Sequence, residues 1–340
     1  MERTNQTQIQ IQTQTQTQTQ TTVKEFFIVG FPGLRPEYYN LMAAIFFLIY
    51  VTTVVGNSLL VTLFFTERRL QKPMYIIMVS LALSDIGLCT VALPKAISRY
   101  WLDDAIISFE VCFFQSFLIH YFETLSSLTM LIMSLDRFLA ICFPLRYPTL
   151  MTNRTMGAVI AFSWLFAAVS PGISVGRVSQ MPFCGPDRVL HCYCDNLSTT
   201  PLVCADTERL HRLSVFLAMF VLLVPLSFIV LSYVSIIMAV LKIADGPGRH
   251  KTFSTCATQL CLIGIYYLPR FVIYLCCLSS FVLLQPNVRI TLTLFYSLFP
   301  PLVNPLIYCY RTKEIKEILN KWGFPGNHVS PKPMLETAFK

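Results

Sequence analysis

Residues 41–65 read LMAAIFFLIYVTTVVGNSLLVTLFF and contain no charged side chain. A helix needs about 20 mainly apolar residues to cross the hydrocarbon core of a bilayer, so this stretch is long enough to span a membrane. Six further apolar stretches hold one charge at most, and they lie at residues 74–93, 111–135, 156–175, 213–241, 252–284 and 290–310. Because lipid offers no hydrogen-bond partners to the backbone, helices are expected for all seven. The sequence therefore predicts an all-α membrane protein, a seven-transmembrane helix bundle.

The composition argues against a water-soluble domain. Only 13% of the 340 residues are charged and 54% are hydrophobic, whereas a soluble domain carries about 25% charge. The short segments of alternating hydrophobicity that build a membrane β-barrel are absent from the sequence. Too little polar surface is present to cover a globule in water.

The net charge of +8 reflects membrane topology rather than nucleic-acid binding. The short loops after the first, third and fifth spans hold lysines and arginines, whereas the turn after the second span holds Asp103, Asp104 and Glu110. By the positive-inside rule, the basic loops lie in the cytoplasm. We therefore expect a multi-pass plasma-membrane protein with its N-terminus outside the cell and no nucleic-acid partner.

Three regions follow from this topology. Residues 1–37 are expected to be an N-terminal tail outside the cell, with a low-complexity Gln/Thr tract at residues 6–22 that cannot bury a core. Asn5 opens a glycosylation sequon in this tail. Residues 38–310 form the seven-transmembrane domain, and residues 311–340 form a cytoplasmic tail.

The cytoplasmic tail is expected to begin with a short amphipathic helix. Ile315, Ile318, Leu319 and Trp322 recur at helical spacing, with lysines between them. This pattern is typical of a helix that lies on the membrane surface, with lipid as its partner. A helix surrounded by solvent is the alternative.

Five of the twelve cysteines lie on the oxidising outer side, where disulfides are expected: Cys112, Cys184, Cys192, Cys194 and Cys204. Cys112 opens the third span, so a bond from it to the long loop after the fourth span would draw that loop over the mouth of the bundle. Five is an odd number, so one thiol is left over. The spacing of residues 191–194, which read HCYC, fits no standard zinc finger, and we expect no metal site.

Several motifs, taken together, point to one family. Residues 70–75 read LQKPMY before the second span, residues 133–142 read MSLDRFLAIC at the end of the third, residues 251–257 read KTFSTCA at the start of the sixth, and residues 300–308 read PPLVNPLIY at the end of the seventh. In combination they resemble the vertebrate odorant (olfactory) receptor branch of the rhodopsin-like (class A) G-protein-coupled receptors. The resemblance covers about residues 25–321.

The resemblance implies a function, a location and a disulfide pattern. A protein of this kind binds a small odorant within the helix bundle and activates a stimulatory-type heterotrimeric G protein that raises cyclic AMP, in cilia of olfactory sensory neurons. The implied disulfides are Cys112–Cys194 and Cys184–Cys204, which leave Cys192 as the extra thiol. No enzyme activity is expected, and no HExxH, P-loop or GxGxxG motif occurs.

Asp85 is an ionisable residue within the second span. Such a group costs about 3 kcal/mol on insertion scales and is a functional candidate by default. The resemblance implies a polar network of Asp85 with Asn57, Ser126 and Asn304 that holds water or a sodium ion. A purely structural hydrogen-bonded cluster is the alternative, and no other cofactor is expected.

The end of the third span carries the candidate G-protein-coupling residues. Asp136 and Arg137 are neighbours that can form a lock, whose release would free Arg137 to meet the G protein. The resemblance adds Tyr233 and Tyr308 as switches that swing inward on activation, with Asn304 in the same motif. Two solvated charges at a helix end are the alternative for the acidic and basic pair taken alone.

Glu123 and Arg270 are charged residues in otherwise apolar spans. His120 precedes Glu123 by one turn on the same helical face, and Tyr267 and Tyr274 share a face with Arg270. We expect these five residues to line one ligand-binding cavity between the third and sixth spans.

Phe117 and Ser116 complete the predicted ligand-binding set. An aromatic side chain such as Phe117 suits the apolar wall of a ligand pocket, and Ser116 lies beside it in the third span. Plain packing between helices is the alternative for the aromatic residue.

Two hypotheses about the ligand stay open. In the first, Arg270 and His120 bind an anionic group of the ligand, such as a carboxylate or sulfate, and Glu123 tunes them. In the second, Glu123 and Arg270 are a permanent internal pair and the ligand is mainly apolar. A third possibility is that Arg270 only extends toward the outer membrane interface.

Other membrane-protein classes fit the sequence less well. A transporter would show internal repeats, and none is visible; a retinal-type pump needs a lysine in residues 290–310, which contain none. An amine receptor needs an aspartate where Ile119 stands. A rhodopsin-like receptor for a non-odorant small molecule or lipid is the nearest alternative.

Overall fold

The structure is a computed structural model that describes residues 23–183, 187–204, 208–242, 247–278 and 285–322. Asn5, the Gln/Thr tract at residues 6–22 and Cys184 lie outside the described residues.

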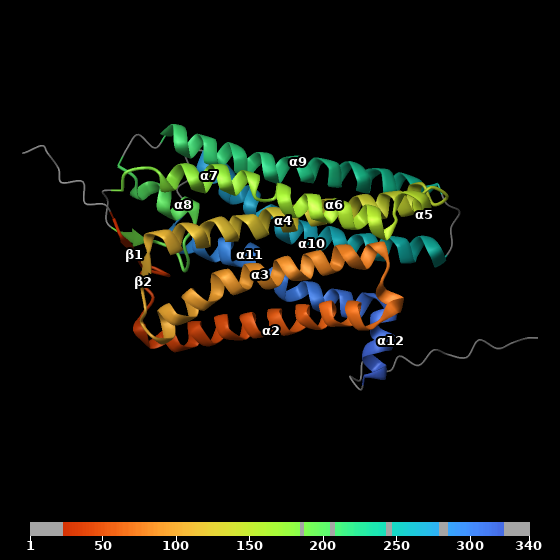
Figure 1. Cartoon of the computed structure of the whole chain (residues 1–340), viewed down its shortest axis with the longest axis horizontal. Coiled ribbons are helices and arrows are strands. Elements are labelled where there is room, and N and C mark those ends of the chain that lie inside the picture. Colours follow the sequence, from red (N-terminus) through yellow and green to blue (C-terminus); the bar gives the residue numbers. More distant parts are fainter. Residues whose placement is uncertain (1–22, 184–186, 205–207, 243–246, 279–284, 323–340) are drawn as a thin grey trace, which may run out of the picture.

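Seven long apolar segments form the bundle, and each is long and apolar enough to cross a membrane (Figure 1). Six of them are single helices, and the fourth span is built from two shorter ones. They are α2 (Tyr39–Thr66), α3 (Pro73–Trp101), α4 (Phe109–Cys142), α6 (Asn153–Phe166) with α7 (Val169–Ser179), α9 (Glu208–Leu241), α10 (Pro247–Leu278) and α11 (Pro286–Arg311). The predicted seven-helix bundle is confirmed.

The fourth span is interrupted between Phe166 and Val169. Pro171 is the third residue of α7 and has no backbone N–H to donate into a preceding turn. A proline is tolerated in the first turn of a helix but not in its interior, so the chain ends one helix and begins another just before it. The apolar run at residues 156–175 predicted one continuous span and not this interruption.

A three-stranded sheet closes one end of the bundle, on the left in Figure 1. The central strand β1 (Glu25–Ile28) is antiparallel to β2 (Ile106–Ser108) and parallel to β3 (Arg188–Val189). Alternate residues of β1 are buried, and Phe26 packs against the rings of Phe109 and Phe183. Part of the predicted tail at residues 1–37 is therefore a structured cover. We call this end the disulfide end, because the Cys112–Cys194 bond lies there.

The opposite end carries α12 (Lys313–Lys321), which turns away from α11 (Figure 1). The predicted amphipathic helix is confirmed. Ile315 and Ile318 are buried in a cluster with Leu63 and Tyr75, so part of its apolar face contacts the bundle. The remaining short elements are η1 (Pro36–Tyr38), η2 (Arg68–Leu70), α5 (Tyr147–Leu150), α8 (Asn196–Thr199) and η3 (Thr200–Leu202).

Close packing of α3 against α4 depends on Gly87. A Cβ atom added at this position would overlap the ring of Phe122 on α4. Three residues before Gly87, Ser84 of α3 shares a hydrogen bond of 3.1 Å with Ser126 of α4. Because Gly87 has no side chain, α3 and α4 can approach each other closely near the buried pair Ser84 and Ser126.

Gly87→Val is expected to lower the free energy of unfolding by about 1–3 kcal/mol, because overpacking forces side chains or backbone to shift. Thermal unfolding of the purified protein in detergent measures this. Gly157→Val is the control, since a Cβ at position 157 of α6 meets nothing within 4 Å. Equal stability of the two variants would contradict the prediction.

Candidate functional site

A buried ion pair joins α4 to α10. Arg270 Nη2 lies 2.9 Å from Glu123 Oε1, and the two residues are only 6% and 5% exposed. Both were predicted to meet near one cavity, and the structure brings them into direct contact. A charge in this setting is tolerated because its partner is within reach.

Further contacts hold both members of the pair. Ser297 of α11 donates to Glu123 Oε1 at 2.7 Å, and the hydroxyl of Tyr266 donates to the backbone oxygen of Glu123. Arg270 Nη1 donates to the Tyr266 hydroxyl at 2.8 Å. The guanidinium also stacks over the rings of Tyr266 and Tyr296, 4.1 and 4.3 Å from their centroids. Three helices, α4, α10 and α11, are thereby connected through one charged pair.

His120 extends this pair toward the disulfide end. Its Nδ1 lies 3.5 Å from Glu123 Oε2 and its Nε2 lies 3.2 Å from Asp195 Oδ1. Burial alone raises the pKa of Asp195, but the nearby imidazole of His120 outweighs burial and lowers this pKa to about 2. We call Arg270, Glu123, His120 and Asp195 the charge chain.

A cavity of about 70 Å³ lies beside the charge chain, between α4, α7, α9 and α10. The loop that contains α8 and η3 contributes residues to its wall. Its polar lining consists of His120, Ser127, Ser170, Ser174, Asn196, Thr200, Ser214, Arg270 and Tyr274, and apolar residues complete the wall. The cavity is therefore rich in hydroxyl groups as well as apolar surface, as expected of a site for a small organic molecule.

The predicted ligand-binding residues divide into two groups. His120, Arg270 and Tyr274 line the cavity. Tyr267 lies behind the wall, where its hydroxyl bonds to Ser127 Oγ at 2.7 Å, and Glu123 lies behind Arg270.

Phe117 and Ser116 do not belong to the cavity lining. The ring of Phe117 stacks on Tyr121, with centroids 6.2 Å apart, and Ser116 is buried. The apolar face of α4 that holds them packs against neighbouring structure instead. Sequence reasoning missed Asp195 and the hydroxyl-bearing residues, since single serines and threonines in apolar helices carry no distinctive pattern.

A second polar cluster surrounds Asp85 deeper in the bundle. Asp85 Oδ2 accepts a hydrogen bond of 2.8 Å from Asn304 Nδ2. Asn57 donates to the backbone oxygens of Thr53 and Pro301 at 2.9 and 3.1 Å. Of the predicted network, Asp85 and Asn304 are directly bonded, while Asn57 bonds to the backbone beside them and Ser126 bonds to Ser84.

A cavity of about 10 Å³ adjoins this cluster, lined in part by Asp85, Ser126 and Asn304. That volume accommodates about one water-sized particle. The side-chain oxygens of Asn57 and Asn304 have no hydrogen-bond partner. Oxygen acceptors around a carboxylate are the ligand type that a hard cation prefers, so the donor set fits either a water molecule or a sodium ion.

The predicted coupling residues lie at the opposite end of the bundle. Asp136 accepts a hydrogen bond of 2.8 Å from the Tyr147 hydroxyl, and Arg137 Nη2 contacts Met74 Sδ at 2.8 Å. Among the ion pairs of the described residues, none joins Asp136 to Arg137. In this conformation the two neighbours make separate contacts, because adjacent residues on a helix point in different directions, and their role as a releasable lock stays a prediction.

The two predicted switch tyrosines lie in the same half of the bundle. The Tyr233 hydroxyl is buried without a hydrogen-bond partner, and the Tyr308 hydroxyl lies 3.6 Å from Met133 Sδ. Both hydroxyls thus lack a strong acceptor in this conformation, and their role as switches stays a prediction.

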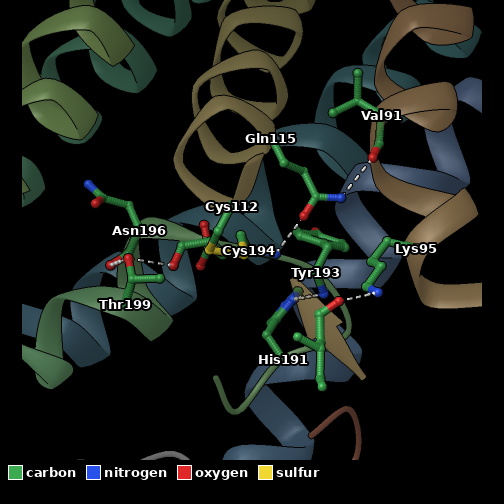
Figure 2. The surroundings of a disulfide bond; sticks show 11 residues. Val91, Lys95, Cys112, Gln115, His191, Tyr193, Cys194, Asn196 and Thr199 are labelled. Carbon is green, nitrogen blue, oxygen red and sulfur yellow. Dashed lines mark hydrogen bonds between the residues drawn. A yellow bond between two sulfur atoms is a disulfide. The ribbon is translucent and has the colours of Figure 1, made fainter. Parts of the chain in front are cut away.

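The disulfide end is held by covalent and polar links (Figure 2). Cys112 of α4 bonds to Cys194, as predicted. Beside this bond, Gln115 donates to the backbone oxygen of Val91 at 2.9 Å and accepts from the backbone N–H of Cys194 at 3.0 Å. The loop at residues 187–204 is therefore attached to α4 and, through Gln115, to α3.

The remaining cysteines of this end agree with the predicted pattern as far as they are described. Cys192 is a free, buried thiol, as expected for the extra cysteine. Cys204 is disulfide-bonded, and its pairing with Cys184 stays a prediction because Cys184 lies outside the described residues. No group of three or more His, Cys, Asp or Glu that could hold a metal occurs among the residues the structure describes.

We expect His191 to make the stability of the loop at residues 187–204 sensitive to acid. Burial lowers the pKa of His191 to about 4, below the usual value of about 6.5. The folded state therefore binds fewer protons than the unfolded state between these values, and stability is lost as the pH falls through this window. At about pH 5 the expected loss is on the order of 2 kcal/mol relative to neutral pH.

Thermal unfolding at about pH 7.5 and about pH 5 tests this expectation. His191→Asn keeps an acceptor for the Tyr193 N–H, which lies 3.4 Å from His191 Nδ1, and removes the titrating group. The variant should lose less stability on acidification than the parent chain. Identical pH dependence of the two proteins would show that His191 does not cause the effect.

Comparison with known proteins adds independent information. The family model described as "Olfactory receptor" matches residues 46–322. Human olfactory receptor 2A5 is 37% identical over 301 residues, which cover 88% of this chain and 95% of the relative. Human olfactory receptor 2A12 is 34% identical over 300 residues, again 88% of this chain and 95% of the relative. The crystal structure of squid rhodopsin shares the fold, with a TM-score of 0.69, 17% identity, and coverage of 86% of this chain and 82% of that one.

Proposed function

The chain belongs to the olfactory receptor family, and from this membership we propose that it is an odorant receptor whose ligand occupies the cavity beside the charge chain. It is a multi-pass plasma-membrane protein of the rhodopsin-like G-protein-coupled class, and a receptor rather than an enzyme. The finer parts of the proposal are a stimulatory-type G protein that raises cyclic AMP, an N-terminus outside the cell, and a place in the cilia of olfactory neurons.

One observation carries the proposal: a hydroxyl-rich cavity lies between the helices and beneath a loop that a disulfide attaches to α4. A ligand there touches α4, α9 and α10 together. It can shift the balance between two arrangements of these helices by the difference in its affinity for them. The geometry also supports the second hypothesis for the buried charges, since Arg270 already has Glu123 as its partner.

The opposite end supplies the proposed contact with the G protein. Among the described residues, Arg137 at the end of α4 has no acidic partner within 4 Å. This arrangement supports a role of its guanidinium in contacting the G protein. The apolar face of α12 not covered by the bundle suits contact with membrane lipid. A sodium ion or a water molecule is proposed for the small cavity next to Asp85.

Cyclic AMP measured in cells that express the chain, against a panel of small odorants, tests the proposal. Ala218→Phe fills the cavity and is expected to abolish the response while leaving the protein at the cell surface. Val224→Phe is the matched control, because position 224 lies on the same helix but is 37% exposed on the outside of the bundle. An unchanged response of the Ala218 variant would place the ligand elsewhere.

A further inference from the structure

The charge chain is balanced, with two acids and two bases in series. His120 and Arg270 face the cavity, while their partners Glu123 and Asp195 stand behind them and do not belong to its lining. His120 lies within 4 Å of two carboxylates, which favour its protonated form, and the four charges then sum to zero. A ligand therefore meets cationic side chains whose charge has already been neutralised from behind.

Arg270 nonetheless retains hydrogen-bonding capacity. Its Nε and Nη2 atoms are buried and have no hydrogen-bond partner. The Nη2 atom is close enough to Glu123 for an ion pair, but its N–H bonds are not directed at the carboxylate. Ser214 Oγ, on α9, is also buried without a partner and lines the same cavity. Unsatisfied buried donors are costly, so an acceptor that enters the cavity is favoured.

The charge balance decides which acceptor fits. A carboxylate would add an uncompensated negative charge to a neutral cluster in a low-dielectric site, and an ammonium group would place its own donors against those of Arg270. An uncharged oxygen accepts a hydrogen bond without disturbing the balance. The cavity of about 70 Å³ is roughly half the size of an engineered cavity of about 150 Å³ that binds benzene, which favours a ligand smaller than benzene.

We propose that this receptor selects small uncharged molecules with a hydrogen-bond-accepting oxygen, such as short ketones and alcohols, and that Glu123 excludes carboxylates by neutralising Arg270. The inference rests on the proposed function and specifies the ligand class of the same cavity.

A set of isosteres tests the class directly. Methyl ethyl ketone, sec-butanol, propanoate, sec-butylamine and isopentane have nearly the same size but differ in charge and in acceptor oxygen. The ketone and the alcohol are expected to act on the parent chain at concentrations on the order of tenfold or more below those of the other three. Cyclic AMP reports signalling, and the thermal stability of the purified receptor with each compound reports binding.

Glu123→Gln provides the sharper test. Without its carboxylate counter-charge, Arg270 is expected to accept the anion of a ligand, so the variant gains response or stabilisation by propanoate on the order of tenfold. Glu110→Gln, an acid-to-amide change at an exposed position of the same helix, should keep the preference of the parent chain. If Glu123→Gln does not reach the cell surface, the isostere series on the parent chain decides by itself.

The outcomes separate the two proposals. Stabilisation by the ketone without a cyclic AMP signal would support the ligand class and contradict the proposed coupling. A signal from propanoate or sec-butylamine, with the ketone and alcohol inactive, would overturn the ligand class and leave the receptor function standing. Neither binding nor signalling by any of the five would overturn the ligand class.

Discussion

Arg270→Ala is expected to lower the free energy of unfolding by about 3–5 kcal/mol, the loss observed when one member of a buried ion pair is removed. The Glu123 carboxylate would keep its bond from Ser297 but would lose its guanidinium partner. It is 5% exposed, so solvent cannot replace the missing charge. We expect little of the variant at the cell surface, because a protein of ordinary stability has only a few kcal/mol to lose.

The double variant Glu123→Ala/Arg270→Ala distinguishes a pair from two independent side chains. Removing both charges leaves no unpaired ion, so the double variant should be more stable than Arg270→Ala alone. Thermal unfolding in detergent and antibody labelling of the cell surface measure the effect. Arg212→Ala serves as the control, since the ion pair of Arg212 with Glu208 is 67% and 70% exposed and contributes little. Additive losses in the double variant would show that Glu123 and Arg270 do not depend on each other.

The seven spans could be predicted because each is a long apolar run that only a membrane helix explains. The third and sixth spans also revealed Glu123 and Arg270, since a charge among apolar residues is conspicuous. Their direct pairing could not be predicted. A rise of about 1.5 Å per residue gives the level of a residue along its own helix, but it says nothing of how neighbouring helices rotate and tilt. Hence the ligand-facing and the internal-pair hypotheses were equally compatible with the sequence.

At the disulfide end, the covalent bond could be predicted but the structure around it could not. Cysteine positions and the family resemblance predicted the Cys112–Cys194 bond, but the loop at residues 187–204 has no helical or strand periodicity. Strand β3 therefore went unpredicted together with its partner β1, and so did the contact of Asp195 with His120. Asp195 directly follows Cys194, which forms a disulfide with Cys112 at the start of α4. Cys112 lies eight residues before His120 in the same helix. The place of Asp195 next to a cysteine of the predicted disulfide was therefore the one sequence feature that indicated a contact with the third span.

Loss of the Cys112–Cys194 bond is expected to be as damaging as loss of the buried pair. The bond spans 82 residues of sequence, and the chain-entropy model assigns between about 3 and 5 kcal/mol to a loop of this length. Cys194→Ser should therefore sharply reduce the receptor at the cell surface and abolish the odorant response of what remains. The response depends on the bond because Cys194 adjoins Asp195, whose contact with His120 connects the loop to the charge chain.

Two further cysteine variants make this prediction specific. Cys261→Ser changes an exposed free thiol on α10 and should leave surface level and response unchanged. Cys192→Ser changes a free thiol two residues from Cys194, and its combination with Cys194→Ser shows whether Cys192 substitutes as the partner of Cys112. If Cys194→Ser alone retained normal stability while the combination did not, the loop would tolerate either cysteine. If both retained it, Gln115 and the strand pairing would suffice to hold the loop, and the covalent link would be dispensable for the fold.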